Sequence, residues 1–226
     1  MRELKMKTEI DMKVYKKRNQ YNWFHTFPDP TYGFNVDINI DKVVKICKER
    51  KESFFIAFLY LIIKAVNSVP EMRLREEDGH VYLYDKINPS YTVMSDEGVY
   101  QNGGCELADD YQGFYKAVRN SIDSLKKQKV SDELNTDSFS KRTDVIYCSD
   151  NPMIDFISMN HPIPAKNYES MSVPRIVIGK YMKKEDGLYH VVVNITVSHT
   201  LVDGFPLSDC FNNLRSYCSD ASFYLK

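Results

Sequence analysis

The sequence predicts an α/β protein, a two-layer sandwich in which helices pack against a mixed, mostly antiparallel sheet. Residues 188–197 alternate between apolar and polar side chains and are rich in β-branched residues, which is typical of a long strand. Residues 53–69 are apolar on nearly every side, which indicates a helix buried against a sheet. The remaining segments mix helices with antiparallel-looking strands, and this order favours two packed layers.

Hydrophobic periodicity and turn signals predict the other elements. Asp41 is the candidate N-cap of the first helix, and a turn around Asn88 and Pro89 is expected between two strands. In chain order we expect a helix from 41 to about 51, strands at 81–84 and 90–94, a helix within 108–129, strands at 145–148 and 175–183, and a helix over 205–217.

The composition fits one soluble globular domain over residues 1–226. Lysine and arginine number 30 and aspartate and glutamate 31, so the net charge of −1 gives no basic field that would attract nucleic acid. Residues 1–11 contain no apolar signal core, and the run 53–69 is too short and too polar for a membrane span. We therefore expect a cytoplasmic protein that binds neither nucleic acid nor a membrane.

The five cysteines are an odd number and include no Cys-x-x-Cys pair. This pattern predicts reduced thiols and argues against both a disulfide framework and a zinc site. No metal is expected.

The segment with the strongest chemical signal is Ser198–Gly204, which follows the predicted strand 188–197 and precedes the last helix. Histidine is the usual general base near neutral pH, and a strand end would hold the imidazole of His199 rigidly. Gly204 is expected to adopt the positive φ of a sharp turn, and Asp203 is expected to stiffen that turn by accepting hydrogen bonds.

His199, Asp203 and Gly204 match the HxxxDG signature of the chloramphenicol acetyltransferases and dihydrolipoyl acyltransferases, and the resemblance extends over almost the whole chain. The further segments that resemble the family are Phe54–Phe58 with Asn67 and Pro70–Arg73, Asp78–Asp85, Pro89 with Tyr91–Val93, Ser149 with Pro152 and Phe156, and Gly179–Tyr181. The resemblance implies the fold of the CoA-dependent acyltransferases. Because no lipoyl domain or linker precedes the domain, the stand-alone antibiotic-type enzyme fits better.

The resemblance also implies a reaction and its residues. His199 would take the proton from an acceptor hydroxyl as that oxygen attacks the thioester of acetyl-CoA, the co-substrate. Ser149 would donate a hydrogen bond to the resulting oxyanion. Asp203 would be structural, and Cys148 would be an ordinary strand residue. Members of the family are trimers with active sites between subunits.

Some positions depart from the family pattern. Lys17 falls where the family has the arginine that pairs with the aspartate, and Arg18 is one residue away, so either is a candidate partner of Asp203. Val177 and Met153 replace a threonine and a tryptophan. Residues 97–102 replace the segment that helps to build the chloramphenicol pocket, so the chemistry is better supported than the acceptor.

Five further residues are candidates for substrate contacts. Trp23, Phe24 and Tyr100 are expected to contact the acceptor, and Lys180 and Tyr181 resemble family positions near CoA.

The leading hypothesis is O-acetylation of chloramphenicol, which confers antibiotic resistance. One alternative is the same chemistry on a different hydroxyl or amine acceptor. Others are a non-catalytic trimeric binding protein, which the presence of His199 and Ser149 argues against, and a dihydrolipoyl acyltransferase core, which the chain length disfavours.

Overall fold

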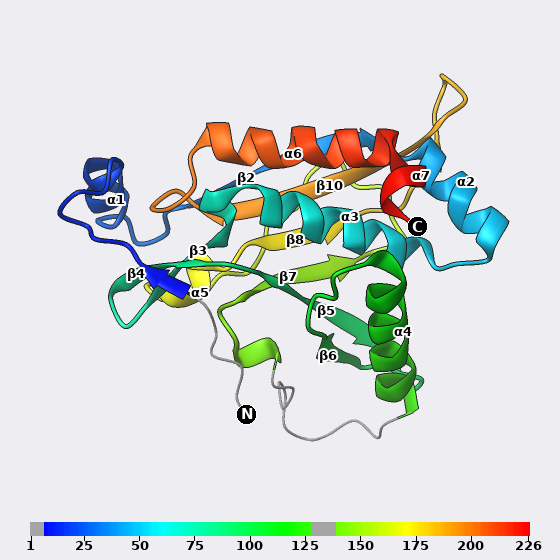
Figure 1. Ribbon diagram of the computed structural model, residues 1–226, viewed down its shortest axis with the longest axis horizontal. Coiled ribbons are helices and arrows are strands. Elements are labelled where there is room, and N and C mark those ends of the chain that lie inside the picture. Colours follow the sequence, from blue (N-terminus) through cyan, green and yellow to red (C-terminus); the bar gives the residue numbers. More distant parts are fainter. Residues whose placement is uncertain (1–6, 128–138) are drawn as a thin grey trace.

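The computed structural model describes residues 7–127 and 139–226, and its centre is a seven-stranded sheet with helices packed over one face (Figure 1). The strand order is β2-β10-β8-β7-β5-β6, with β9 paired to β10. The pairs β5–β7 and β7–β8 are parallel, and the other pairs in this sheet are antiparallel. The predicted mixed, mostly antiparallel sheet is therefore confirmed. The strands of the main sheet are β2 (Thr31–Asn39), β5 (Asn88–Met94), β6 (Tyr100–Gly104), β7 (Val145–Asp150), β8 (Arg175–Ile178), β9 (Met182–Lys183) and β10 (Tyr189–Ser198).

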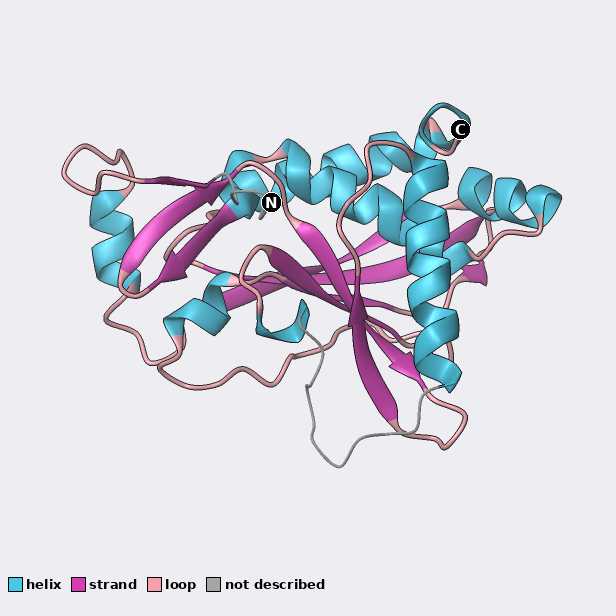
Figure 2. Ribbon diagram, turned by 60° about the horizontal axis from the view of Figure 1, so that its bottom comes forward, coloured by secondary structure: helices cyan, strands magenta, loops and turns pink. Residues whose placement is uncertain are grey.

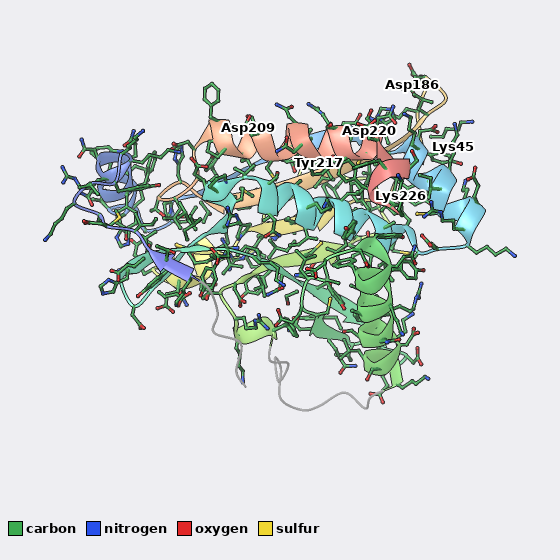
Figure 3. The ribbon with its side chains drawn as sticks, viewed as in Figure 1. Lys45, Asp186, Asp209, Tyr217, Asp220 and Lys226 are labelled. Atoms are coloured by element: carbon green, nitrogen blue, oxygen red, sulfur yellow. The ribbon has the colours of Figure 1, made fainter. Side chains whose placement is uncertain are left out.

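Two long helices, α3 and α6, lie side by side over the sheet, and both bury apolar side chains against it (Figure 1). α3 was expected to be buried and has ten buried residues among its fifteen. α6 is amphipathic, because Leu207 and Phe211 are buried while Asp209 is exposed on its outer side (Figure 3). The helices are α1 (Arg18–Phe24), α2 (Asp41–Arg50), α3 (Phe54–Ser68), α4 (Tyr111–Lys127), α5 (Tyr168–Ser172), α6 (Gly204–Ser219) and α7 (Ala221–Tyr224), with 3₁₀ turns at Pro70–Arg73 and Phe139–Lys141.

β10 shows why the two faces of the sheet differ. Val191, Val193, Ile195 and Val197 alternate along the strand and are buried in the core beneath the helices. The residues between them, such as Asn194 and Thr196, point to the opposite face. That face is partly covered by residues 151–167, from which the N–H of Met159 donates to Asn35 Oδ1 at 3.3 Å.

A second, three-stranded sheet of order β1-β4-β3 packs beside the main one, to its left in Figure 2. It comprises β1 (Lys7–Glu9), β3 (Leu74–Glu77) and β4 (His80–Tyr84). The expected strands 81–84 and 90–94 both exist, but they belong to different sheets. The turn expected around Asn88 and Pro89 is wrong, because both residues belong to β5 and the Asn88 side chain accepts from the N–H of Leu107 at 2.8 Å.

Two other expectations are corrected. Residues 175–183 form two strands because Gly179 and Lys180 leave the regular ladder, and the N–H of Lys180 donates to the carbonyl of Ile154. Asp41 is not the N-cap of α2; Ile40 is, and the Asp41 carboxylate pairs with Lys45 one turn along the helix at 2.6 Å. The backbone N–H of Asp41 instead donates to the side-chain oxygen of Asn39, with 3.1 Å between Asp41 N and Asn39 Oδ1.

Several boundaries and elements were not expected from the sequence. α4 ends at Lys127, and residues 128–129 of the expected helix lie outside the described residues, as do residues 1–6 of the N-terminal segment. β2 is nine residues long and was missed, although Tyr32, Phe34, Val36 and Ile38 alternate along it. Within the described ranges, none of the helices combines the length and the apolar character that a bilayer crossing requires.

Candidate active site

His199 follows the last residue of β10 and lies in the turn that leads into α6. Its N–H donates to the carbonyl of Pro30 at 2.9 Å, and the N–H of Val202 donates to the carbonyl of Ser198 at 3.0 Å. The turn is therefore fixed by backbone hydrogen bonds before Asp203 begins the helix as its N-cap residue.

The imidazole of His199 lies between two aromatic rings. Phe24, at the end of α1, stacks on it with centroids 3.8 Å apart and an interplanar angle of 14°. Tyr32 of β2 lies at 4.5 Å. The side chain of His199 is 30% exposed, yet its Nδ1 is buried and has no hydrogen-bond partner in the described part of the chain. Because Nδ1 is closed to solvent, Nε2 is the ring nitrogen left to take a proton from a substrate.

The Tyr32 hydroxyl donates to the carbonyl of Val202 at 3.2 Å. Burial, together with the nearby charge of Asp203, raises the pKa of Tyr32 to about 12, so the phenol stays protonated at neutral pH. Tyr32 therefore shapes the surroundings of His199 and does not compete with it as a base.

Asp203 is bound by Lys17 and not by Arg18. The Lys17 ammonium lies 2.8 Å from Asp203 Oδ2 and 3.1 Å from Glu71 Oε1. Partial burial opposes the charge of Lys17, but the hydrogen bonds to Asp203 and Glu71 outweigh it and raise the pKa of Lys17. Arg18 instead donates to the carbonyl of Lys13 at 3.1 Å. Asp203 Oδ1 is 3.8 Å from His199 Nδ1, which is too long for a hydrogen bond.

Lys17→Ala is expected to lower turnover by roughly 10-fold, because a charge-assisted hydrogen bond contributes about 1.5–3 kcal/mol and this one anchors Asp203. Arg18→Ala is the matched control and should leave turnover within about twofold of wild type, since the Arg18 side chain donates to the exposed carbonyl of Lys13. Turnover of both purified variants is measured under the same conditions. Equal losses in both variants would contradict the assignment of Lys17.

Gly204 does not have the expected positive φ. It is the first residue of α6, and it is not among the glycines with positive φ, which are Gly79, Gly98 and Gly187. A Cβ at Gly204 would meet no atom within 4 Å. The reversal of the chain is completed earlier, at residues 198–202, so the backbone does not require glycine here.

Ser149 lies near the carboxyl end of β7, on the sheet face opposite the helices. The strand register places it beside Val177 of β8, which pairs with Asn194 of β10, which in turn pairs with Asn35 of β2. These four residues form a row across the sheet and share a face. Thr92 Oγ1 of the neighbouring β5 lies 3.4 Å from Ser149 Oγ, a long contact that leaves the serine hydroxyl available as a donor.

The same register shows that one chain cannot bring Ser149 and His199 together. His199 lies five residues beyond Asn194 along β10, whereas Ser149 is level with Asn194 and two strands away. At about 3.3 Å per residue and about 4.8 Å per strand, the two α-carbons are separated by roughly 15–20 Å. In Figure 1 the β10–α6 turn lies beside α1 at the left, whereas the arrow of β7 points to the right.

The other candidate residues divide between these two ends of the sheet. Trp23 is 63% exposed on α1 beside Phe24, and its ring contacts Phe27 edge-on at 5.9 Å. Tyr100 pairs with Met94 at the end of β5 that lies beyond Thr92, so it belongs to the end that carries Ser149.

Lys180 and Tyr181 also lie at the end that carries Ser149, in the break between β8 and β9. Lys180 is exposed, and the ring of Tyr181 packs against Phe54 at 4.7 Å and Tyr189 at 5.8 Å. The side chains of Lys45 and Asp186 mark this end in Figure 3, far from α1.

Two residues beside Ser149 point the other way, into the helix layer. Cys148 is 2% exposed, and burial strongly raises the pKa of its thiol, so it is not an activated nucleophile. Burial also raises the pKa of Asp150 from 3.8 to about 6, and none of the lysine, arginine or histidine side chains in the described ranges forms an ion pair with it.

Asp150→Asn is expected to stabilise the protein at neutral pH. Because the folded pKa of Asp150 lies above the unfolded value, its burial destabilises the fold progressively as pH rises from about 4 to about 7, by on the order of 2 kcal/mol. The variant should therefore melt at a higher temperature than wild type at pH 7.5 and at the same temperature near pH 3.5. Thermal melts at the two pH values check this, and an equal gain at both would show that charge is not the cause.

Three features of the site were not predicted from the sequence. Glu71, in the Pro70–Arg73 turn, is the second partner of Lys17. Tyr32 could have been found from the alternation along β2. The third is a polar cluster on the Ser149 face, in which Asn194 Nδ2 donates to Asn35 Oδ1 at 3.0 Å and His161 Nε2 lies 3.1 Å from Asn194 Oδ1. No local sequence pattern indicates that cluster, because its members come from three separate segments.

The sequence and the structure both match one group of known proteins. A family model described as chloramphenicol acetyltransferase matches residues 6–215. The chain is 24% identical over 216 residues to a chloramphenicol acetyltransferase of Escherichia coli, covering 94% of each chain, and 25% identical over 205 residues to one of Bacillus pumilus, covering 89% of each.

A solved chloramphenicol acetyltransferase structure superposes with a TM-score of 0.85 at 24% identity, covering 94% of this chain and 100% of the other. A probable dihydrolipoamide acetyltransferase of Listeria monocytogenes shares the fold with a TM-score of 0.62 at 11% identity, covering 94% of each chain. With the family match over nearly its whole length, this chain belongs to the chloramphenicol acetyltransferase family and is an acyltransferase.

Proposed function

We propose that this protein transfers an acetyl group from acetyl-CoA to chloramphenicol, in active sites that lie between neighbouring subunits of a homotrimer. The observation that carries the proposal is the position of His199 and Ser149 at opposite ends of the sheet. Each chain carries His199 at one end of its sheet and Ser149 at the other. A complete pair therefore combines His199 of one chain with Ser149 of a second copy. The names of the relatives and the family match support the choice of substrates.

In the proposed reaction, His199 accepts the proton of the acceptor hydroxyl through Nε2 as the oxygen attacks the thioester carbonyl. Ser149 of the neighbouring subunit donates its hydroxyl proton in a hydrogen bond to the oxyanion. The carbon–sulfur bond then breaks, and the protonated His199 returns the proton to the departing sulfur. The products are the acetyl ester and CoA with a free thiol, and no acyl-enzyme forms.

The remaining candidates support these two groups. Trp23 and Phe24 would contact the acceptor beside His199, and Tyr100 would contact it from the end that carries Ser149. Lys180 and Tyr181 would contact CoA, with the lysine ammonium free to pair with a phosphate. The ion pair of Lys17 with Asp203 would hold the turn that carries His199.

We further propose that residues 1–226 form one domain of this type and that the protein works in the cytoplasm. The five free thiols, all of them buried, support a reducing compartment.

A different hydroxyl or amine acceptor is a second candidate, and one observation favours it. The face that carries Ser149 also carries the hydrogen-bonded side chains of His161, Asn194 and Asn35. Polar groups at this site would favour an acceptor with additional hydroxyl or amine groups. Thiol release from acetyl-CoA, measured with chloramphenicol and a panel of amino and hydroxyl acceptors, decides between the two.

The intersubunit site makes a specific prediction for mixed assemblies. Light scattering should report about three chains per particle.

His199→Ala and Ser149→Ala chains, each inactive alone, should regain activity when co-refolded in equal amounts. With random assembly, about a quarter of the sites would combine an intact His199 with an intact Ser149. A mixture that stays as inactive as its components, although it has co-assembled, would contradict the intersubunit site.

A further inference from the structure

We propose that Glu76 and His25 form a positioning pair that holds α1 against the body of the protein and thereby sets Phe24 on the ring of His199. Neither residue belongs to the HxxxDG motif, and neither was a candidate from the sequence. The effect on catalysis rests on the proposed function, whereas the effect on the position of α1 does not.

Glu76 is a buried acid on β3, with its side chain only 5% exposed. Its Oε1 lies 2.9 Å from His25 Nε2, whereas its Oε2 is buried without a hydrogen-bond partner among the described residues. A carboxylate can only accept, so Nε2 of His25 carries the proton. Because a buried carboxylate is costly to leave unpaired, this hydrogen bond strongly favours the docked position of His25.

His25 is also held through its ring and its backbone. Its imidazole stacks on Tyr168 of α5 with centroids 3.9 Å apart and an interplanar angle of 19°. The hydroxyl of Tyr168 donates to the carbonyls of His25 and Phe27, each at 3.0 Å. The residue that follows α1 is therefore clamped between β3 and α5, two elements of the protein body.

None of the seven residues of α1 is fully buried, although Tyr21 packs against the core, where burial and the neighbouring Glu76 raise the pKa of its phenol. The residue before α1, Lys17, is tied to Asp203 and Glu71, and the residue after it, His25, is tied to Glu76. Phe24 is next to His25 in the chain and makes the stacked contact with His199. The His25–Glu76 pair lies nearest to this contact along the chain and holds it in place together with the Lys17 ion pairs and the packing of Tyr21.

The chain offers a direct reporter, since its single tryptophan, Trp23, lies on α1. Time-resolved fluorescence anisotropy of Trp23 measures the local motion of the helix without any substrate. His25→Ala should add a fast component to the decay, whereas His25→Gln, which keeps a donor for Glu76, should not. His80→Ala is the matched control, because His80 forms the same kind of pair with Glu9 at 2.8 Å, but on the surface of the small sheet.

The activity measurement separates positioning from general stability. His25→Ala should raise the KM for the acceptor by roughly 10-fold, from the loss of a charge-assisted hydrogen bond. The KM for acetyl-CoA should stay unchanged, because the proposed CoA contacts, Lys180 and Tyr181, belong neither to α1 nor to the residues that hold it. His25→Gln should restore most of the acceptor KM, and His80→Ala should match wild type.

A folded His25→Ala protein with wild-type anisotropy and wild-type acceptor KM would overturn the proposed pair. An equal rise of the acceptor KM in His25→Gln and His25→Ala would also overturn it. If the wild-type protein acetylated none of the acceptors tested, the proposed function would fail, and the anisotropy of the three variants would still decide whether the pair positions α1.

Discussion

His199→Ala should lower the turnover of acetyl transfer by about 10²–10⁴-fold, the usual contribution of a general base. Two neighbouring groups do not compete with the imidazole for the proton: Tyr32 stays protonated because its pKa is raised to about 12, and Lys17 stays charged because its pKa is raised. A hydroxyl acceptor without a base loses little of its proton to water at neutral pH, so the attack on the thioester slows. Thiol release from acetyl-CoA measures the loss.

The fold should survive this substitution. The His199 side chain makes no hydrogen bond in the described part of the chain, and the turn is fixed by the N–H groups of His199 and Val202, which alanine at 199 leaves in place. The far-ultraviolet circular dichroism and the affinity for acetyl-CoA should therefore remain close to wild type, as they should in His80→Ala. Near-normal turnover of the folded variant would refute the role of His199.

Ser149→Ala should lower turnover by about 10²–10³-fold, the effect of removing one oxyanion donor. The hydroxyl bonds a charge that develops only as the acceptor attacks, so the loss belongs to the transition state. The Michaelis constants for both substrates should therefore barely change. Ser149→Cys should restore little activity, because a thiol is a weak donor.

A structural role for Ser149 gives a different result. The only described partner of its hydroxyl is Thr92 Oγ1 at 3.4 Å, a contact too long to contribute much stability. We therefore expect the melting temperature of Ser149→Ala to match wild type. A lower melting temperature combined with unchanged turnover per folded molecule would show that the serine stabilises β7 and that another group binds the oxyanion. Both quantities are measured on one preparation.

The sequence predicts well those elements whose signal is local. β10 and α3 were predicted because their patterns run over ten and fifteen residues. That length is enough to distinguish the two-residue repeat of a strand from a buried helix. β2 was missed although its apolar residues also alternate, because Asn35 and Asp37 between them read as loop residues. Those polar side chains are tolerated because the outer face of the sheet carries polar partners such as Asn194.

The site was predictable as a set of residues but not as an arrangement. The turn around His199 carries its own motif, whereas the distance between His199 and Ser149 depends on strand order and register, which no local pattern encodes. The choice between Lys17 and Arg18 was open for the same reason. It depends on the direction in which α1 docks, and the contacts that dock it, Glu71 and Glu76, lie about fifty residues further along the chain.

The separation of His199 and Ser149 also bears on how activity would depend on the amount of protein in a cell. Within one chain the catalytic pair is incomplete. In the proposed assembly, the fraction of working sites follows the association equilibrium between chains, and specific activity rises with concentration until the chains are fully assembled. A cell that makes little of this protein would then gain proportionally less activity than one that makes a lot, and dilution of a cell extract far enough to separate the chains would lower the activity per chain.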